Sequence, residues 1–269
     1  MLTIFDYDFM RNAFAAATIV AVLAGIVGYF LVLRSQTFAG HALAHVGFTG
    51  ATGAVLVGLS PLWGLVLMTV GAGVGMGFMG EKLAERDVAI GLVLAFALAL
   101  GLLFLHFFTA YATQATTLLF GNVFAVDTST IWTLLALATP TLALLAVISR
   151  PLLFASLQPE LAEAKGVPVR LYGILFLTVV ALTTAECAQI VGVLLVFALM
   201  VGPAATAQQL TTSVTMGILV AAILALLEAW FGIALAFYTD WPASFWITAL
   251  SVGAYLLSVI GRRLRPAAA

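Results

Sequence analysis

The chain has 269 residues, of which ten are Lys or Arg and eleven are Asp or Glu. Charged side chains make up only 8% of it and hydrophobic residues 64%, whereas soluble domains are ~25% charged. This composition excludes a water-soluble globular protein, because too little polar surface is present to cover one. A net charge of −1 gives no case for nucleic-acid binding, and a single cysteine, Cys187, excludes an internal disulfide.

Apolar segments of about 20 residues, the length that crosses a bilayer as a helix, recur along the sequence. Two histidines and several glycines make the second segment the least certain, so eight spans remain an alternative to nine. We therefore expect an all-α polytopic membrane protein with eight or nine transmembrane helices. The expected spans are 10–33, 38–58, 61–80, 88–108, 129–149, 171–186, 188–207, 213–237 and 243–261.

The positions of Lys and Arg predict the orientation, because these residues favour the cytoplasmic side of a membrane. With the N-terminus outside and nine crossings, Arg11 is the one basic residue that falls outside. The nine that fall inside are Arg34, Lys82, Arg86, Arg150, Lys165, Arg170, Arg262, Arg263 and Arg265. This strong asymmetry favours an outside N-terminus.

The expected cytoplasmic segment between the fifth and sixth spans contains the signals of one short helix, at about residues 156–166. Pro159 suits a first helical position, and Glu160 and Glu163 favour the positive end of the helix dipole. Gly166 is a stop signal, so a helix of two turns, roughly 10 Å long, is expected. Such a helix can transmit force to a partner protein; the alternative is a surface helix that only joins two spans.

The densest group of polar residues within an expected span is GHALAHVGFTGATG, at residues 40–53. His41 and His45 are four residues apart, so on a helix they share one face and can approach a single ion. Imidazole is a common ligand for zinc, copper and nickel, and polar groups are costly inside a membrane. We therefore favour metal contact over a structural role for this pair.

Two catalytic signatures are absent from the sequence. The zinc hydrolase pattern H-E-x-x-H has a general-base Glu beside the first histidine, but Ala42 follows His41 here. The chain also has no G-x-x-x-x-G-K-[ST] phosphate-binding loop. Any ATP-driven cycle must therefore draw its energy from a partner.

Other ionisable residues in or near the expected spans are weaker candidates. Glu186 lies in TTAECAQ, at the expected junction of the sixth and seventh spans, where we favour a solvated interfacial position over a role in an ion path. Glu228 lies inside the eighth span, which favours a buried functional or pairing role. His106, at the end of the fourth span, is expected to be interfacial. A row of alternate glycines in the third span is expected to serve helix packing: Gly71, Gly73, Gly75 and Gly77.

Five blocks of sequence resemble, in order, the membrane permeases of ABC importers for zinc and manganese, the ABC-3 family. They are LRSQTFAGHALAHVGFTGATGA, ERDVAIGLVLAFALALG, LLFGNVFAV, PELAEAKGVPV and VGVLLVFALMVGPAATA. The resemblance implies a single transmembrane permease domain over 1–269, acting as a homodimer in a bacterial cell (inner) membrane. It also implies two cytoplasmic ATP-binding subunits, which dock on a coupling helix at 156–166 containing Glu160, Glu163 and Gly166. The resemblance further implies an extracellular or periplasmic metal-binding protein that delivers the metal.

One departure from the family pattern concerns the metal site itself. The family commonly has Gly-Asp-Ala-Leu-Ser-His where this chain has Gly40 to His45, so His41 replaces the Asp of an Asp-x-x-x-His metal pair. Facing protomers would then present four histidines, and nitrogen ligands fit zinc better than manganese. Thr49 stands where the family has a proline, which leaves the local helix geometry open.

The sequence therefore predicts a transport subunit and no enzyme, with no permanently bound cofactor and no nucleic-acid partner. The expected cargo is a divalent transition metal, zinc in preference to manganese, carried by alternating access past His41 and His45. Glu186 and Glu228 are further candidate ligands. The alternatives are an intramembrane zinc-dependent enzyme, with one of these glutamates as its base, and a secondary transporter driven by an ion gradient.

Overall fold

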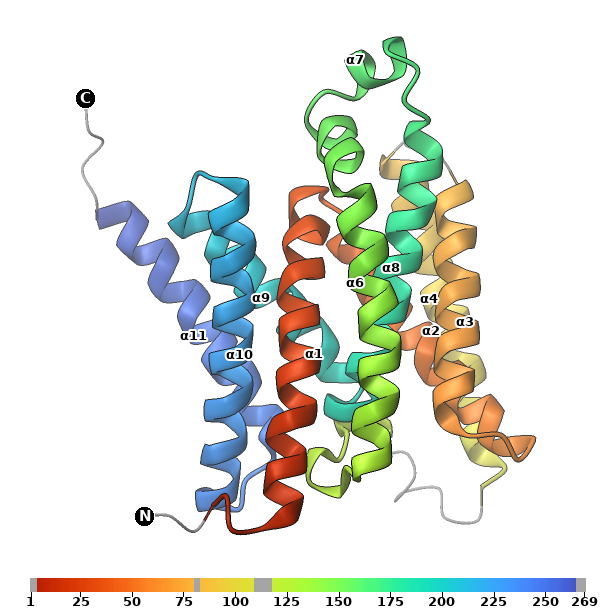
Figure 1. Cartoon of the computed structure of the whole chain (residues 1–269). Coiled ribbons are helices and arrows are strands. Elements are labelled where there is room, and N and C mark those ends of the chain that lie inside the picture. The colour runs from red at the N-terminus through yellow and green to blue at the C-terminus, as the bar shows by residue number, and fades with distance from the viewer. Residues whose placement is uncertain (1–3, 80–82, 109–117, 265–269) are drawn as a thin grey trace.

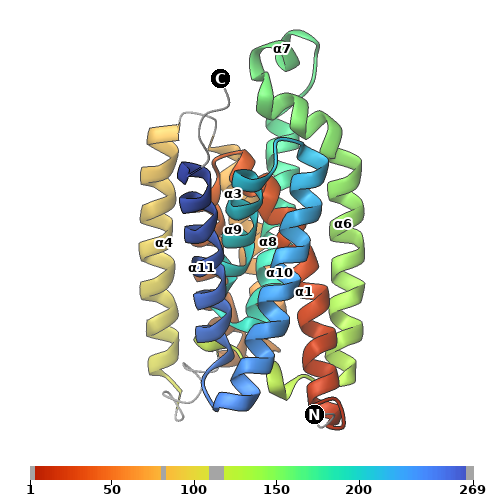
Figure 2. The same cartoon turned by 90° about the vertical axis from the view of Figure 1, so that its left-hand side faces the viewer.

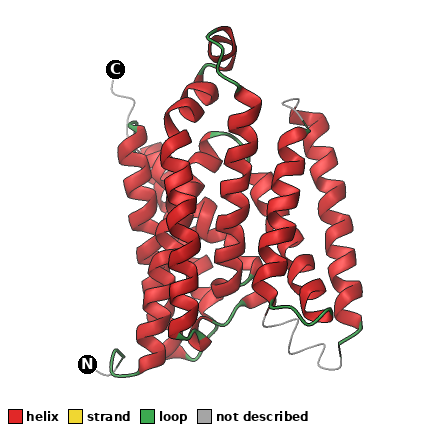
Figure 3. Cartoon of the chain, turned by 45° about the vertical axis from the view of Figure 1, so that its right-hand side comes forward, coloured by secondary structure: helices red, strands yellow, loops and turns green. Residues whose placement is uncertain are grey.

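The computed structural model describes residues 4–79, 83–108 and 118–264, without the side chains of residues 83–86 and 264. Every regular element in these ranges is helical (Figures 1 and 3). Lys82, Arg265 and the side chain of Arg86, all expected on the cytoplasmic side, lie outside the described residues. The elements are α1 (Asp8–Leu33), α2 (Thr37–Leu56), α3 (Pro61–Phe78), α4 (Leu83–His106), η1 (Val123–Ala125), α6 (Thr128–Leu157), α7 (Pro159–Ala164), α8 (Val169–Val191), α9 (Val193–Leu210), α10 (Val214–Thr239) and α11 (Ala243–Leu264).

Eight of the described helices are long and apolar enough to cross a membrane. The helix α2, which connects α1 to α3, is not one of the eight, although its 20 residues reach about 30 Å at 1.5 Å per residue. The first helix begins at one end of the bundle and α11 ends at the other (Figure 1). The expected all-α fold with eight or nine transmembrane helices is confirmed, and α2 is the helix on which the choice of number depends.

The two ends of the bundle differ in their charged residues. At one end α7 projects above the C-terminal end of α6 (Figures 1 and 2). Arg34 caps α1 at this end, Lys165 caps α7, and Arg262 and Arg263 lie in the last turn of α11. Since positive residues favour the cytoplasmic side, we infer that α7 lies on that side, as the sequence predicts.

Glycines bring the helix backbones close together, as is common where helices pack in a membrane. A Cβ atom built on Gly28 of α1 would lie 1.9 Å from the carbonyl oxygen of Met200 on α9. In the third span, Gly73 and Gly77 face the backbone of α8, whereas a Cβ on Gly71 or Gly75 would meet nothing within 4 Å. One of the two overlapping G-x-x-x-G patterns therefore serves packing, and the other does not.

The expected junction between the sixth and seventh spans is wrong by several residues. The structure continues α8 without a break to Val191, and Gly192 makes the turn with a φ of 81°. A Cβ on Gly192 would lie 2.2 Å from the backbone nitrogen of Gly121. The chain turns at the residue where left-handed backbone and a close backbone neighbour both require glycine, and nothing in TTAECAQ breaks a helix.

The expected coupling helix exists but is shorter than 156–166. Its first two residues belong to the end of α6, and α7 runs only from Pro159 to Ala164. The predicted end signals are confirmed, because Gly166 has a φ of 77° and its N–H donates to the carbonyl of Glu163 at 2.8 Å. The N–H of Val167 donates to the carbonyl of Ala162 at 2.9 Å, which completes a Schellman motif.

A candidate metal site on α2

The side chains of His41 and His45 lie against each other on α2. Their ring centroids are 4.8 Å apart with an interplanar angle of 81°, and both residues are partly exposed. The residues between them, Ala42 to Ala44, are buried, because α2 packs against α3, α4, α8 and α9. The i, i+4 spacing places the two imidazoles on the same face of α2, as predicted, and leaves both of them partly exposed.

An aromatic ring from another helix covers one side of the pair. Phe197 of α9 lies 5.2 Å from the ring centroid of His41, edge to face, and is itself 37% exposed. The Nδ1 atom of His45 is buried and has no hydrogen-bond partner among the described residues. The pair thus presents imidazole nitrogens that the surrounding helices do not use.

One protomer supplies only part of a metal site. No group of three or more His, Cys, Asp or Glu side chains among the described residues is placed to hold a metal ion. Protein sites for transition metals commonly use four ligands, or three and an open position. His41 and His45 therefore form only part of a complete ligand set.

The helix that carries the pair is continuous, which answers the question left open by Thr49. α2 remains helical through Thr49 to Leu56, and the Thr49 hydroxyl donates to the carbonyl of Ala97 on α4. Thr49 is 1% exposed, so this bond lies inside the helix pair. The imidazoles are held by a regular helix and not by an unwound segment.

Both glutamates are buried inside the bundle. The expectation that Glu186 is interfacial and solvated is therefore wrong. Glu186 is 0% exposed on α8 and Glu228 is 5% exposed on α10. The oxygens of both carboxyl groups are buried without a hydrogen-bond partner among the described residues. Glu186 is enclosed because α8 runs on past it to Gly192. Neither glutamate joins the histidine pair in a cluster, and their role as ligands stays a prediction.

The residues expected to couple to a partner lie on the exposed surface of α7. Glu160 and Glu163 are exposed, and Ala162 is the one buried residue of this helix. Ala162 packs with Ala155 of α6 and Val169 of α8. The small helix is therefore held by one side and presents its carboxylates away from the bundle.

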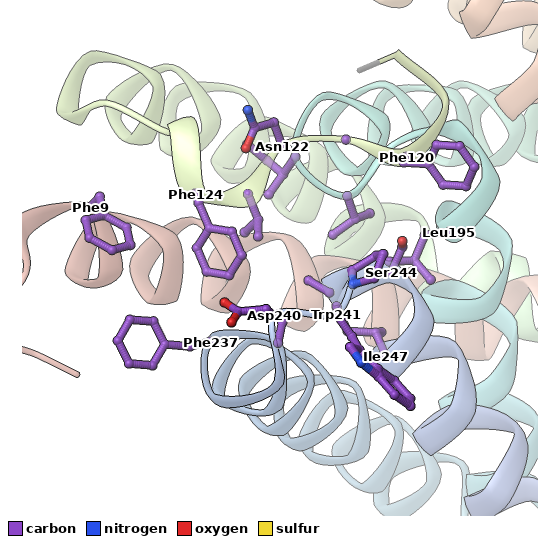
Figure 4. A pocket seen from close by; sticks show the side chains of 17 residues that line it. Phe9, Phe120, Asn122, Phe124, Leu195, Phe237, Asp240, Trp241, Ser244 and Ile247 are labelled. Atoms are coloured by element: carbon purple, nitrogen blue, oxygen red, sulfur yellow. The ribbon is translucent and has the colours of Figure 1, made fainter. Parts of the chain in front are cut away.

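A cavity of about 600 Å³ (Figure 4) lies beside the connection between α10 and α11, at the opposite end of the bundle from α7 (Figure 1). Phe9, Phe124, Phe237 and Trp241 line it, and Asp240 is the charged residue among the described lining. None of the predicted site residues lines this cavity. No local sequence pattern predicts this cavity, because its walls come from four separate segments of the chain.

Comparison with known proteins decides the family. The sequence profile of the ABC 3 transport family matches residues 6–262. The chain belongs to this family. It is 31% identical over 229 residues to the manganese transport system membrane protein MntC of Listeria innocua, covering 85% of this chain and 81% of that protein. It is 30% identical over 203 residues to the manganese import system permease protein ScaB of Streptococcus gordonii, covering 75% and 73%.

The solved structures support the same assignment for this ABC 3 permease. PsaBC from Streptococcus pneumoniae in complex with Fab matches with a TM-score of 0.85 and 26% sequence identity, covering 95% of this chain and 92% of that chain. The permease is thus a multi-pass membrane subunit of a bacterial ABC transporter and is not itself catalytic. The intramembrane enzyme and the gradient-driven secondary transporter are wrong.

Proposed function

We propose that this permease carries a divalent transition metal ion into the cell and that His41 and His45 bind the ion on its way. The observation that carries the proposal is the pair of partly exposed imidazoles, 4.8 Å apart, on a helix inside the bundle. Ionisable side chains within a membrane-embedded bundle are costly and are therefore candidates for a functional site. Substrate sites near the middle of the membrane are common in transporters.

We further propose a homodimer as the transporting unit. One protomer supplies two imidazoles and no third ligand among its described residues, so a second copy facing the first would complete a set of four. The proposed organisation is one permease domain over residues 1–269. Its α7 docks on cytoplasmic ATP-binding subunits, and an extracellular or periplasmic protein delivers the metal on the other side.

Manganese is the cargo that the relatives support, since MntC and ScaB are both named as manganese transport proteins. The preference for zinc expected from the sequence has no support among them. The imidazole pair nevertheless favours zinc chemically, because nitrogen ligands suit zinc and oxygen ligands suit manganese. We therefore propose manganese as the cargo and expect zinc to compete strongly for the same site.

Metal uptake by cells that lack other importers tests the proposal. The double variant His41→Ala, His45→Ala, expressed with the partner subunits, should take up neither labelled manganese nor labelled zinc, although the complex still assembles. The matched control is His106→Ala, which removes the third histidine of the chain from an exposed position at the end of α4. Normal uptake by the double variant would refute the site, and equal loss in the control would show that any histidine matters.

A further inference from the structure

One arginine, in the turn between α1 and α2, contacts both α6 and α8, the helices that flank α7. Arg34 directly follows α1, and its Nη1 donates to Oγ of Ser156 in the last turn of α6 at 2.6 Å. Its Cζ lies 5.5 Å from the centroid of the Phe176 ring on α8. Because α7 lies between α6 and α8 in the chain, this side chain contacts both of the helices that flank α7. We call these two helices, α6 and α8, the α7 frame.

The connection from Arg34 to the histidine pair is short and stiff. Only Ser35 and Gln36 separate Arg34 from α2, and Ser35 has a φ of 54°. The N–H of Gln36 donates to the carbonyl of Leu31, and that of Ser35 to the carbonyl of Val32, each at 3.0 Å. These bonds form a Schellman motif, and Gln36 is buried, with 6% of its surface exposed. The turn between α1 and α2 is therefore fixed by hydrogen bonds and by packing.

The same turn is bonded to the helix that follows it. The carbonyl of Gln36 accepts the N–H of Gly40 at 3.2 Å, and His41 is the next residue. A displacement of Arg34 therefore reaches His41 through hydrogen-bonded backbone rather than through a loose loop.

The helix α7 is itself packed against both α6 and α8. Ala162 of α7 packs between Ala155 of α6 and Val169 of α8, and Nζ of Lys165 lies 5.7 Å from the ring centroid of Phe154 on α6. A push on α7 would therefore act on the end of α6 and the start of α8, the two helices that Arg34 contacts.

A second arginine, on α8, also combines a hydrogen bond with an aromatic contact, here to the end of α3. Nη2 of Arg170, in the first turn of α8, donates to the carbonyl of Phe78 at 3.0 Å, and its Cζ lies 5.3 Å from the ring centroid of the same residue. Phe78 ends α3, the helix that follows α2. Both sequence neighbours of α2 are thus tied to the α7 frame by an arginine that bonds and stacks at once.

We propose that Arg34 is a positioning residue that transmits movement of α7 to the histidine pair on α2. Arginine suits this role because its planar guanidinium can donate a hydrogen bond while it stacks on an aromatic ring, which a lysine does less well. The inference rests on the proposed function, since it takes His41 and His45 as the metal site and α7 as the docking helix. It adds the residue through which the two are mechanically connected.

The complete transporter, purified with its ATP-binding subunits and reconstituted with its metal-delivering protein, tests the role. Arg34→Gln should lower the amount of metal transported per ATP hydrolysed by roughly tenfold, within the usual range of coupling between distant sites. Binding of manganese to the solubilised transporter should be unchanged, because the histidines are untouched. Arg34→Lys should restore part of the ratio, since it keeps the charge.

The matched control is Arg150→Gln, which removes the same charge from an exposed position on α6 and should leave the ratio unaltered. Should Arg34→Gln fail to assemble, Ser156→Ala removes the acceptor instead and should lower the ratio in the same direction by a smaller factor. An unchanged ratio in Arg34→Gln, or an equal fall in the control, would overturn the role. So would a loss of manganese binding in proportion to transport.

The outcomes also separate this inference from the proposed function. If the double histidine variant still transports metal, the metal site is wrong whatever Arg34→Gln does. If the double variant is inactive and Arg34→Gln transports normally, the metal site stands and only the role of Arg34 falls.

Discussion

Two kinds of ionisable group lie within the helical bundle: the histidine pair on α2 and the glutamates on α8 and α10. They differ in exposure and in their contacts with each other. His41 and His45 are partly exposed and touch each other. Glu186 and Glu228 are at most 5% exposed, on separate helices, with carboxyl oxygens that no described residue bonds. Burial cost alone marks all four as candidates. What distinguishes a site is that its polar groups converge and that an ion can reach them.

The comparison depends first on the length of α8, because Glu186 is enclosed only if the helix runs past it to Gly192. Gly192→Ala places a Cβ 2.2 Å from the Gly121 nitrogen at a φ of 81°. A backbone with φ 81° and ψ 157° is adopted almost only by glycine and costs about 1–3 kcal/mol for a residue with a side chain. We expect a large loss of folded protein, measured as thermal stability in detergent. Gly71→Ala, whose Cβ would meet nothing within 4 Å, is the control and should be tolerated; equal stability of the two variants would contradict the close contact.

The second prediction changes the chemistry of the accessible pair and keeps its position. His41→Asp should raise manganese uptake relative to zinc uptake by roughly tenfold, because a carboxylate oxygen suits manganese better than an imidazole nitrogen does. Competition uptake with both labelled metals measures the ratio. His106→Asp is the control for an added carboxylate, and a ratio that His41→Asp leaves unaltered would show that residue 41 does not contact the ion.

The third prediction tests the enclosed side of the comparison. Glu186→Gln and Glu228→Gln should each change metal uptake by less than about twofold. An enclosed, unpartnered carboxylate is costly, so the uncharged amide of similar shape is a mild replacement. Uptake assays at equal expression check this. Abolished uptake in either variant would return that glutamate to the metal path and remove the contrast with the histidines.

The smallest effect is expected for a carboxyl group in water. The Oδ1 atom of Asp127 accepts the N–H of Thr130 at 2.8 Å at the start of α6, and Ser129 donates to Oδ2 at 2.9 Å. These hydrogen bonds, that to Thr130 first, lower the pKa of Asp127. A lowered pKa stabilises the folded state above the unfolded pKa, and that stability is lost as the pH falls through the folded pKa, below about pH 4. Asp127→Asn keeps a capping side chain and should remove this small acid-dependent loss in thermal stability; an identical pH profile would contradict the assignment.

Local signals were sufficient where the structure depends on near neighbours in the chain. The spacing of His41 and His45 predicts their contact, because i and i+4 share a face on any helix. Gly166 predicts the end of α7 for the same reason, since a Schellman motif is made by adjacent residues. Proline at 159 likewise marks the first residue of α7.

Local sequence signals do not predict features that depend on contact with a segment distant in the chain. The ends of the apolar runs predict a junction at Glu186, but the turn occurs where Gly121 and Gly192 approach each other, 71 positions apart in the sequence. The contacts of Arg34 with Ser156 and Phe176 have the same character. The sequence places Arg34 on the cytoplasmic side and shows nothing of what it holds.

The scarcity of charge and the apolar segments determine by themselves that this is a polytopic helical membrane protein, and the distribution of Lys and Arg predicts its orientation. These properties follow from transfer of each segment into lipid, which depends on local composition. Only the tertiary structure decides that the imidazoles stay accessible, that the glutamates are enclosed and that Arg34 ties α2 to the frame of α7. Exposure and contact depend on which helices pack together, and in a membrane that is set by close fit between surfaces far apart in the sequence.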